Sequence, residues 1–140
     1  MNTFHIVMEA APDPADLTLI EQKVADAAVS AAGVGVEQEI AVFVRDDDGR
    51  TVGGVCGITW AGYCELHAMW VDEAWRGRGL ARELIATAED EARRRGCAQV
   101  IFMAYDLLAP GLYERLGYDT VATIQDCPAG SAARWYRKRL

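Results

Sequence analysis

Hydrophobic residues recur with a helical period in the first part of the chain. Asp13 and Pro14 predict a helix start, because aspartate caps a first turn and proline suits the first helical position. The apolar residues that follow keep helical spacing: Leu17, Ile20, Val24, Ala27 and Ala31. Gly33 and Gly35 interrupt the pattern. We therefore predict a helix here, preceded by a short strand over residues 4–9.

The middle of the chain has the composition of β-strands joined by turns. Residues 40–45 and 51–59 flank an Asp-Asp-Gly turn and predict a hairpin. An Ala-Gly turn at 61–62 then leads into another strand over residues 64–71.

After Gly79 the hydrophobic period changes to 3.6, which predicts a helix. Its apolar stripe contains Leu80, Ala81, Leu84, Ile85, Ala88 and Ala92. The arginines at 93–95 suit the negative end of the helix dipole, and Gly96 ends the helix. The remaining predicted elements are a buried strand, a short helix and two strands, at residues 100–105, 110–116, 118–124 and 134–140.

This order of elements predicts a mixed α/β (α+β) fold in a single domain over residues 1–140. We expect a mostly antiparallel sheet of six to seven strands with about four helices. The strands at 64–71 and 100–105 are connected by a helix rather than by a turn. They therefore predict a parallel β-α-β unit at the centre of the sheet.

The net charge of −7 is distributed unevenly along the chain. Residues 1–72 contain 12 acidic and 3 basic residues, whereas residues 73–140 contain 9 and 11. A nucleic-acid-binding protein would be basic throughout, so we expect no nucleic-acid partner. Two interpretations of the asymmetry stay open: an anionic ligand on one side and a cationic substrate on the other, or solvated surface charge alone.

The cysteines predict free thiols rather than a metal site. They are widely spaced and include no Cys-x-x-Cys pair: Cys56, Cys64, Cys97 and Cys127. The only histidines are His5 and His67, and we expect no metal. No apolar run reaches the ~18 residues that a membrane span needs, and the N-terminus does not have the pattern of a signal peptide. We therefore expect a cytoplasmic protein with no membrane partner.

The segment 69–81 carries the strongest chemical signal. A predicted strand runs into a turn with Gly77 and Gly79, and the turn runs directly into an amphipathic helix. Glycines let backbone N–H groups approach a ligand closely, and a helix N-terminus favours an anion. The segment predicts a diphosphate cradle with Arg76 and Arg78 at its rim. A tight strand-to-helix turn would use the same glycines, so the glycines alone do not decide between the two.

Two common phosphate-binding motifs do not fit this segment. The Walker loop ends in Gly-Lys-Ser/Thr, which is missing, and Arg82 occupies the last glycine position of the dinucleotide fingerprint. The segment instead resembles the Arg/Gln-x-x-Gly-x-Gly/Ala signature of the GNAT N-acetyltransferase superfamily, through Arg76, Gly79 and Ala81.

A second segment has the same resemblance at the expected distance. Residues 109–118 read Ala-Pro-Gly-Leu-Tyr-Glu-Arg-Leu-Gly-Tyr, which is similar to the Ala-x-x-Phe-Tyr-x-x-x-Gly-Phe motif of that family. The resemblance covers residues 50–140 well and residues 1–45 by element order only. It implies a GNAT-like fold, acetyl-CoA as co-substrate, no metal and a homodimer.

The resemblance also implies which residues would hold acetyl-CoA. The main chain at Met69 and Val71, with Trp70 between them, would pair with the pantetheine arm like an added strand. The diphosphate would lie on the loop residues Arg76, Gly77, Arg78, Gly79, Leu80 and Ala81. Asp106 occupies the position of a cofactor-contacting asparagine. An ionised aspartate cannot donate, so an electrostatic role toward a cationic substrate is the alternative.

Tyr113 is the predicted general acid of the transfer. A phenol with a pKa near ~10 is protonated at neutral pH and can donate to a thiolate whose conjugate acid lies near ~8.5. The acceptor amine must also lose a proton. Glu65 resembles the catalytic glutamate of some histone-type family members and is the predicted base. His67 lies on the same face of an ideal strand and is an alternative base or a substrate-binding residue.

The predicted function is transfer of the acetyl group of acetyl-CoA to a primary amine of a small molecule or peptide. The amine would attack directly in a ternary complex. Two alternatives stay open. One is a non-catalytic acyl-CoA-binding regulatory module on the same fold, which would not need Tyr113. The other is an acetyltransferase that modifies a protein or peptide.

Overall fold

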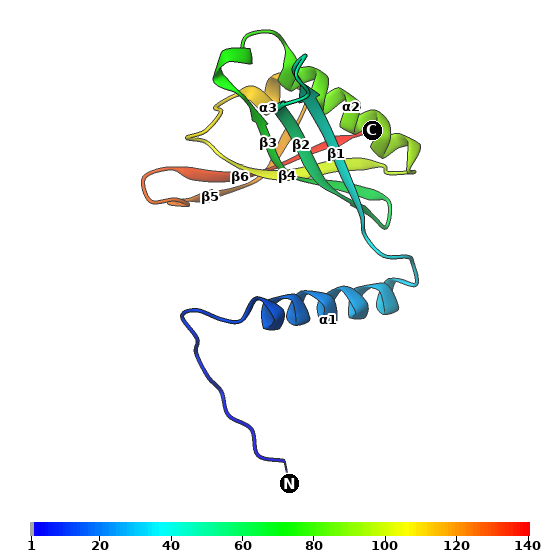
Figure 1. Cartoon of the computed structure of the whole chain (residues 1–140), viewed down its shortest axis with the longest axis vertical. Coiled ribbons are helices and arrows are strands. Elements are labelled where there is room, and N and C mark those ends of the chain that lie inside the picture. The colour runs from blue at the N-terminus through cyan, green and yellow to red at the C-terminus, as the bar shows by residue number, and fades with distance from the viewer. Residues whose placement is uncertain (1) are drawn as a thin grey trace. The chain divides into compact units, whose positions relative to one another are not determined.

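The computed structural model describes residues 2–140 (Figure 1). The chain divides into two compact units, the first ending at Val36 and the second comprising Glu37–Leu140. The single domain over residues 1–140 stays a prediction. None of the helices in the described residues combines the length and hydrophobicity that a membrane crossing requires.

The first unit contains helix α1, Pro14–Ala32, with the ends that the sequence predicts. The Asp13 side chain accepts a hydrogen bond from the Ala15 N–H, and Gly33 ends the helix at a φ of +67°. The strand predicted over residues 4–9 is wrong, because these residues have no regular structure. The described residues before Glu37 provide no second strand to satisfy its backbone groups.

The second unit contains one six-stranded mixed sheet in the order β1-β2-β3-β4-β6-β5. The strands are β1 Gln38–Arg45, β2 Thr51–Trp60, β3 Tyr63–Val71, β4 Gln99–Tyr105, β5 Asp119–Gln125 and β6 Ala132–Arg139. The helical elements are the 3₁₀ turn η1 Glu73–Trp75, α2 Leu80–Arg94 and α3 Leu112–Arg115. β3 and β4 are parallel and the other pairs antiparallel, which confirms the predicted mixed fold and its central β-α-β unit.

The core of this unit lies between α2 and the sheet (Figure 1). The predicted stripe of α2 is buried at Leu84, Ile85, Ala88 and Ala92, which pack with Ile40, Val55, Cys64, Leu66, Val100 and Phe102. The C-terminal end of the helix is fixed to the sheet by Arg95. Its guanidinium donates to the Glu39 carbonyl at 2.9 Å and to Thr59 Oγ1 at 3.0 Å.

The parallel strands β3 and β4 diverge after a short paired stretch. Within residues 37–140 their pairing runs from Tyr63 opposite Gln99 to Glu65 opposite Ile101. Residues 66 and 68–71 stay paired with β2, whereas residues 66–71 have no partner on the β4 side. This divergence opens the sheet near its middle and creates the space for the site described below.

A β-bulge at His67 changes which side chains of β3 face the core. Gly57 of β2 lies opposite Leu66, and Cys56, the residue before Gly57, lies opposite Ala68. No residue of β2 is left to pair with His67, which is therefore the extra residue of the bulge. Before the bulge Leu66 is buried in the core, and after it Met69 and Val71 pack against the core. A Cβ at Gly57 would collide with the β3 backbone, so the close approach of the two strands requires glycine there.

Candidate active site

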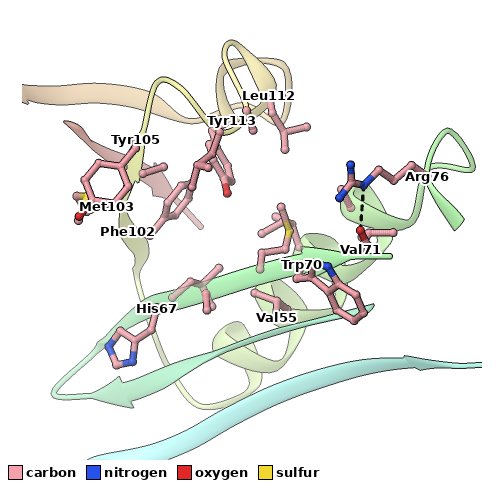
Figure 2. Close-up of a pocket in the computed structure, with 18 residues that line it drawn as sticks. Val55, His67, Trp70, Val71, Arg76, Phe102, Met103, Tyr105, Leu112 and Tyr113 are labelled. Carbon is pink, nitrogen blue, oxygen red and sulfur yellow. Dashed lines mark hydrogen bonds between the residues drawn. The ribbon is translucent and has the colours of Figure 1, made fainter. Parts of the chain in front are cut away.

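A pocket of about 790 Å³ lies where β3 and β4 separate (Figure 2). Its walls come from β2, β3, β4, the start of α2, and α3 with the segment that leads into it. Figure 2 shows Arg76 beside Val71 at one end of the pocket, with Met103 and Tyr105 at the other. The two sequence motifs, at residues 76–81 before β4 and residues 109–118 after it, therefore meet at one cavity.

The glycine-rich turn forms an open helix start at one end of this pocket. Gly77 and Gly79 have φ values of +74° and +79°, a region that strongly favours glycine, and nothing lies within 4 Å of an added Cβ at either position. Gly79 is the N-cap of α2, and no side chain caps the helix. The first N–H groups of α2 have no acceptor within the helix, so this end can receive an anion.

Two arginines flank the helix start, each held by the protein. Arg76 lines the pocket, and its Nε donates to the Val71 carbonyl at 3.0 Å (Figure 2). The Arg78 guanidinium lies 4.8 Å from the centre of the Trp75 ring, a cation–π contact. The positive charges of both residues are thus fixed beside the helix N-terminus.

The backbone of β3 presents hydrogen-bonding groups toward the gap. The Asp72 N–H donates to the Val52 carbonyl on β2 at 2.8 Å. Backbone groups alternate in direction along an antiparallel strand, so those of Trp70 also face β2. The groups of Met69 and Val71 then face the side from which β4 has diverged. The Val71 carbonyl accepts from Arg76 Nε, and the other outward main-chain groups of Met69 and Val71 are the ones that an extended ligand could pair with.

Tyr113 lies against an aromatic cluster at the wall of the pocket. Its ring centre is 4.2 Å from that of Phe102 and 5.3 Å from that of Tyr136. Burial raises the pKa of Tyr113 above its ordinary value of 10.0. The phenol is therefore protonated at neutral pH and can act as a proton donor.

Glu65 and His67 lie close together despite the bulge. His67 Nε2 is 3.8 Å from Glu65 Oε1, and the two side chains are 51% and 28% exposed. His67 lines the pocket together with Leu66, whereas Glu65 is not among the described lining residues. His67 is therefore the residue of this pair that borders the pocket, and Figure 2 shows its ring directed away from Phe102 and Tyr113.

The carboxylate of Asp106 is already paired. It accepts two hydrogen bonds from Arg134, at 2.7 Å to Nε and 3.0 Å to Nη2. The interaction raises the pKa of the Arg134 guanidinium. Because its charge is paired with Arg134, Asp106 offers no unpaired negative charge to a cationic substrate. It is also not among the described residues that line the pocket.

A buried polar group behind the pocket was missed by sequence reasoning. The Glu89 carboxylate on α2 is 4% exposed and accepts from the Tyr118 hydroxyl at 3.0 Å and from Lys138 Nζ at 3.0 and 3.1 Å. Burial, and then the charge of Glu89, raise the pKa of Tyr118. The available signal was a carboxylate inside the apolar stripe of α2, four residues after Ile85 and three before Ala92.

The divergent parallel strands and the open helix start are the features that the resemblance to acetyltransferases implies for a site that binds acetyl-CoA. The family model described as "Acetyltransferase (GNAT) family" matches residues 9–118, and the chain belongs to this family. The resemblance inferred from the two sequence motifs is thereby confirmed.

Individual proteins with sequence or structural similarity agree with the family assignment. Acetyltransferase Atu2258 of Agrobacterium fabrum is 33% identical over 108 residues, which cover 77% of this chain and 79% of that protein. Blasticidin-S acetyltransferase of Streptomyces morookaense is 36% identical over 101 residues, covering 71% and 74%. A crystal structure of a candidate acetyltransferase from Agrobacterium tumefaciens superposes with a TM-score of 0.90 at 28% identity, covering 98% of this chain and 100% of that one.

Proposed function

We propose that this acetyltransferase transfers the acetyl group of acetyl-CoA to a primary amine of a small molecule. The amine would attack the thioester directly while both substrates are bound. One observation carries the proposal: the open N-terminus of α2, the edge of β3 that β4 leaves unpaired and Tyr113 all border the same pocket.

The chain has groups that fit each part of the acetyl donor. The diphosphate would accept hydrogen bonds from the main chain of residues 77–81, with Arg76 and Arg78 supplying positive charge. The pantetheine arm would pair with the main chain of Met69 and Val71 beside Trp70. The open space around Gly77 and Gly79 supports this assignment, because a blocked turn could not admit phosphate oxygens.

In the proposed chemistry one bond forms, one bond breaks and two protons move. The amine nitrogen attacks the thioester carbonyl carbon, a C–N bond forms and the C–S bond breaks. Tyr113 gives its proton to the departing thiolate, which is a general-acid step. The excess proton on the amine passes to the pair formed by His67 and Glu65. The position of His67 on the pocket wall supports giving the contact with the amine to the imidazole, with Glu65 as its partner.

A small-molecule acceptor is supported by the pocket and by one relative. The cavity of about 790 Å³ lies within the size range of small-molecule sites. Blasticidin-S acetyltransferase is named for a small molecule and is 36% identical over 101 residues. The alternative acceptor is the amine of a peptide. Turnover measured with a panel of small amines and peptides distinguishes the two acceptors.

The decisive experiment replaces Tyr113 by phenylalanine and measures released CoA thiol with a panel of amines. We expect kcat to fall by about 10²–10⁴ while the Kd for CoA stays unchanged, because only the proton donor is removed. Tyr63→Phe is the matched control, since Tyr63 packs on Trp60 away from the pocket-lining residues.

Two results would contradict the proposal. Full turnover of Tyr113→Phe would assign the proton to another group. Tight CoA binding without turnover of any amine by the unmodified protein would instead indicate a non-catalytic acyl-CoA-binding module.

A further inference from the structure

We propose that Glu89, Lys138 and Tyr118 form a positioning network that fixes the location of the Tyr113 phenol. The inference rests on the proposed acid role of Tyr113. It is drawn from the buried Glu89 carboxylate on α2, which accepts hydrogen bonds from Tyr118 and Lys138. Both of these residues also contact the helix that carries Tyr113.

The helix that carries Tyr113 cannot hold its own position. α3 comprises only Leu112–Arg115, and a single helical turn is not stable in isolation. Gly111 begins this turn at a φ of +73°, and no side chain caps it. The orientation of the Tyr113 ring must therefore depend on contacts made with neighbouring elements.

Lys138 supplies one of these contacts. Its ammonium on β6 donates to the Leu116 carbonyl at 3.2 Å, which is the end of the α3 turn, and to both carboxylate oxygens of Glu89. These three acceptors match the three donors of an ammonium group. Lys138 thus bridges the long, well-packed helix α2 to the short helix α3.

Tyr118 supplies the second contact. Its N–H donates to the Tyr113 carbonyl at 3.0 Å, and its hydroxyl donates to Glu89 at 3.0 Å. Its ring centre lies 5.0 Å from that of Phe102, whose ring also contacts Tyr113. Backbone and ring contacts therefore both transmit the position of Tyr118 to Tyr113.

The charges around Glu89 hold the members of the network together. The cations facing the carboxylate are Lys138, from β6, and Arg93, one turn later on α2 with Nη2 3.8 Å away. These partners restrain the geometry of the carboxylate, because leaving the buried Glu89 charge unpaired is costly. Hydrophobic residues could fill the same volume, but they would not hold the Leu116 carbonyl.

A double-mutant cycle tests this inference in the full-length protein. Misplacing a catalytic group by about 1 Å can cost about 10²-fold in rate, so we expect Lys138→Met to lower kcat by about 10- to 100-fold. We expect the KM for acetyl-CoA to change by less than about twofold, since Lys138 is not among the pocket-lining residues. In a Tyr113→Phe background, the same Lys138→Met change should alter kcat by less than about twofold, because its effect acts through the absent hydroxyl.

Controls separate positioning from folding. Arg139→Met makes a similar change at the next, exposed residue of β6 and should leave kcat unchanged. Tyr118→Phe removes only one hydroxyl and serves as the second variant if Lys138→Met does not fold. Its smaller loss of kcat should also vanish in the Tyr113→Phe background.

The outcomes distinguish this inference from the proposed function. If Lys138→Met and Tyr118→Phe lower kcat equally in both backgrounds, or lower it in neither, the positioning inference is overturned while the acid role of Tyr113 stands. If Tyr113→Phe alone leaves kcat unchanged, the proposed acid role is overturned first and the inference with it.

Discussion

Each catalytic residue of the proposed mechanism depends on its immediate neighbours for its chemical role. His67 is placed by the bulge and by Glu65 3.8 Å away, and Tyr113 is placed by the rings around it. Both residue types were recognisable in the sequence. The sequence could not show that the Asp106 carboxylate is paired with Arg134. Residue 134 lies 28 residues later, on β6, and meets Asp106 only in the folded chain.

His67→Asn should lower turnover more at neutral pH than at high pH. A lysine-type amine has a pKa near ~10.4, so at pH 7 almost every acceptor molecule must lose a proton before attack. Near pH 9 the neutral fraction is about 100-fold larger and the need for a base decreases. Profiles of kcat/KM against pH for the variant and the unmodified protein would show this difference. A loss of equal size at all pH values would mean that His67 binds the acceptor without taking its proton.

Among the secondary-structure elements, α2 was predicted best and β3 least completely. The stripe of α2 and its glycine ends are local signals, and the structure has both. The bulge in β3 has no local signal, because it depends on the close approach of β2 at Gly57. The strand at residues 4–9 failed for the opposite reason. Its composition favours a strand, but a strand needs a partner and the described first unit provides none.

Glu91→Gln should weaken the C-terminal end of α2 in a pH-dependent way. Hydrogen bonds from Arg94 and then Arg95 lower the pKa of Glu91 from 4.5 to about 2. A carboxyl with a lowered pKa stabilises the folded chain above its ordinary pKa and loses this contribution as the pH falls toward the lower value. We therefore expect a lower Tm for Glu91→Gln at pH 7, with the difference shrinking between pH 4.5 and about 2.

Thermal unfolding followed by circular dichroism checks this prediction. The control is Glu21→Gln, an exposed change in the middle of α1. A Tm difference for Glu91→Gln that stays constant from pH 7 to pH 3 would contradict the role assigned to the two arginines.

The whole molecule joins distant parts of the sequence at one pocket. The motif at residues 76–81 and the motif at residues 109–118 could each be read locally, and their family resemblance brought them together. The contacts among Glu89, Tyr118 and Lys138 span up to 49 residues of sequence and were not predictable from spacing. The sequence therefore predicted the sheet and the strand-to-helix turn, and it singled out Tyr113, whose role stays a prediction. It did not indicate the network behind Tyr113.

CoA should stabilise the whole protein against unfolding. A ligand that binds only the folded state at about 100 times its Kd adds about 2.7 kcal/mol to the free energy of unfolding, which corresponds to a rise in Tm of several degrees. Arg76→Met should reduce this rise, because the variant lacks a positive charge at the pocket. The control Arg50→Met changes an exposed arginine of the β1–β2 turn and should keep the full rise. If CoA does not raise the Tm of the unmodified protein, the acetyl-donor assignment is wrong.

The extra residue in β3 has a consequence for how this strand could tolerate length changes. Leu66 lies opposite Gly57 and Ala68 lies opposite Cys56, so deleting His67 would join two residues that already pair with consecutive residues of β2. Met69 and Val71 would still pack against the core, and Trp70 would still face away from it. If the strand instead kept its length and paired regularly, Ala68 and Trp70 would follow Leu66 onto the core face. The bulge is therefore what turns Met69 and Val71 toward the core in a strand of this length, and shortening the strand by this one residue should leave their facing unchanged.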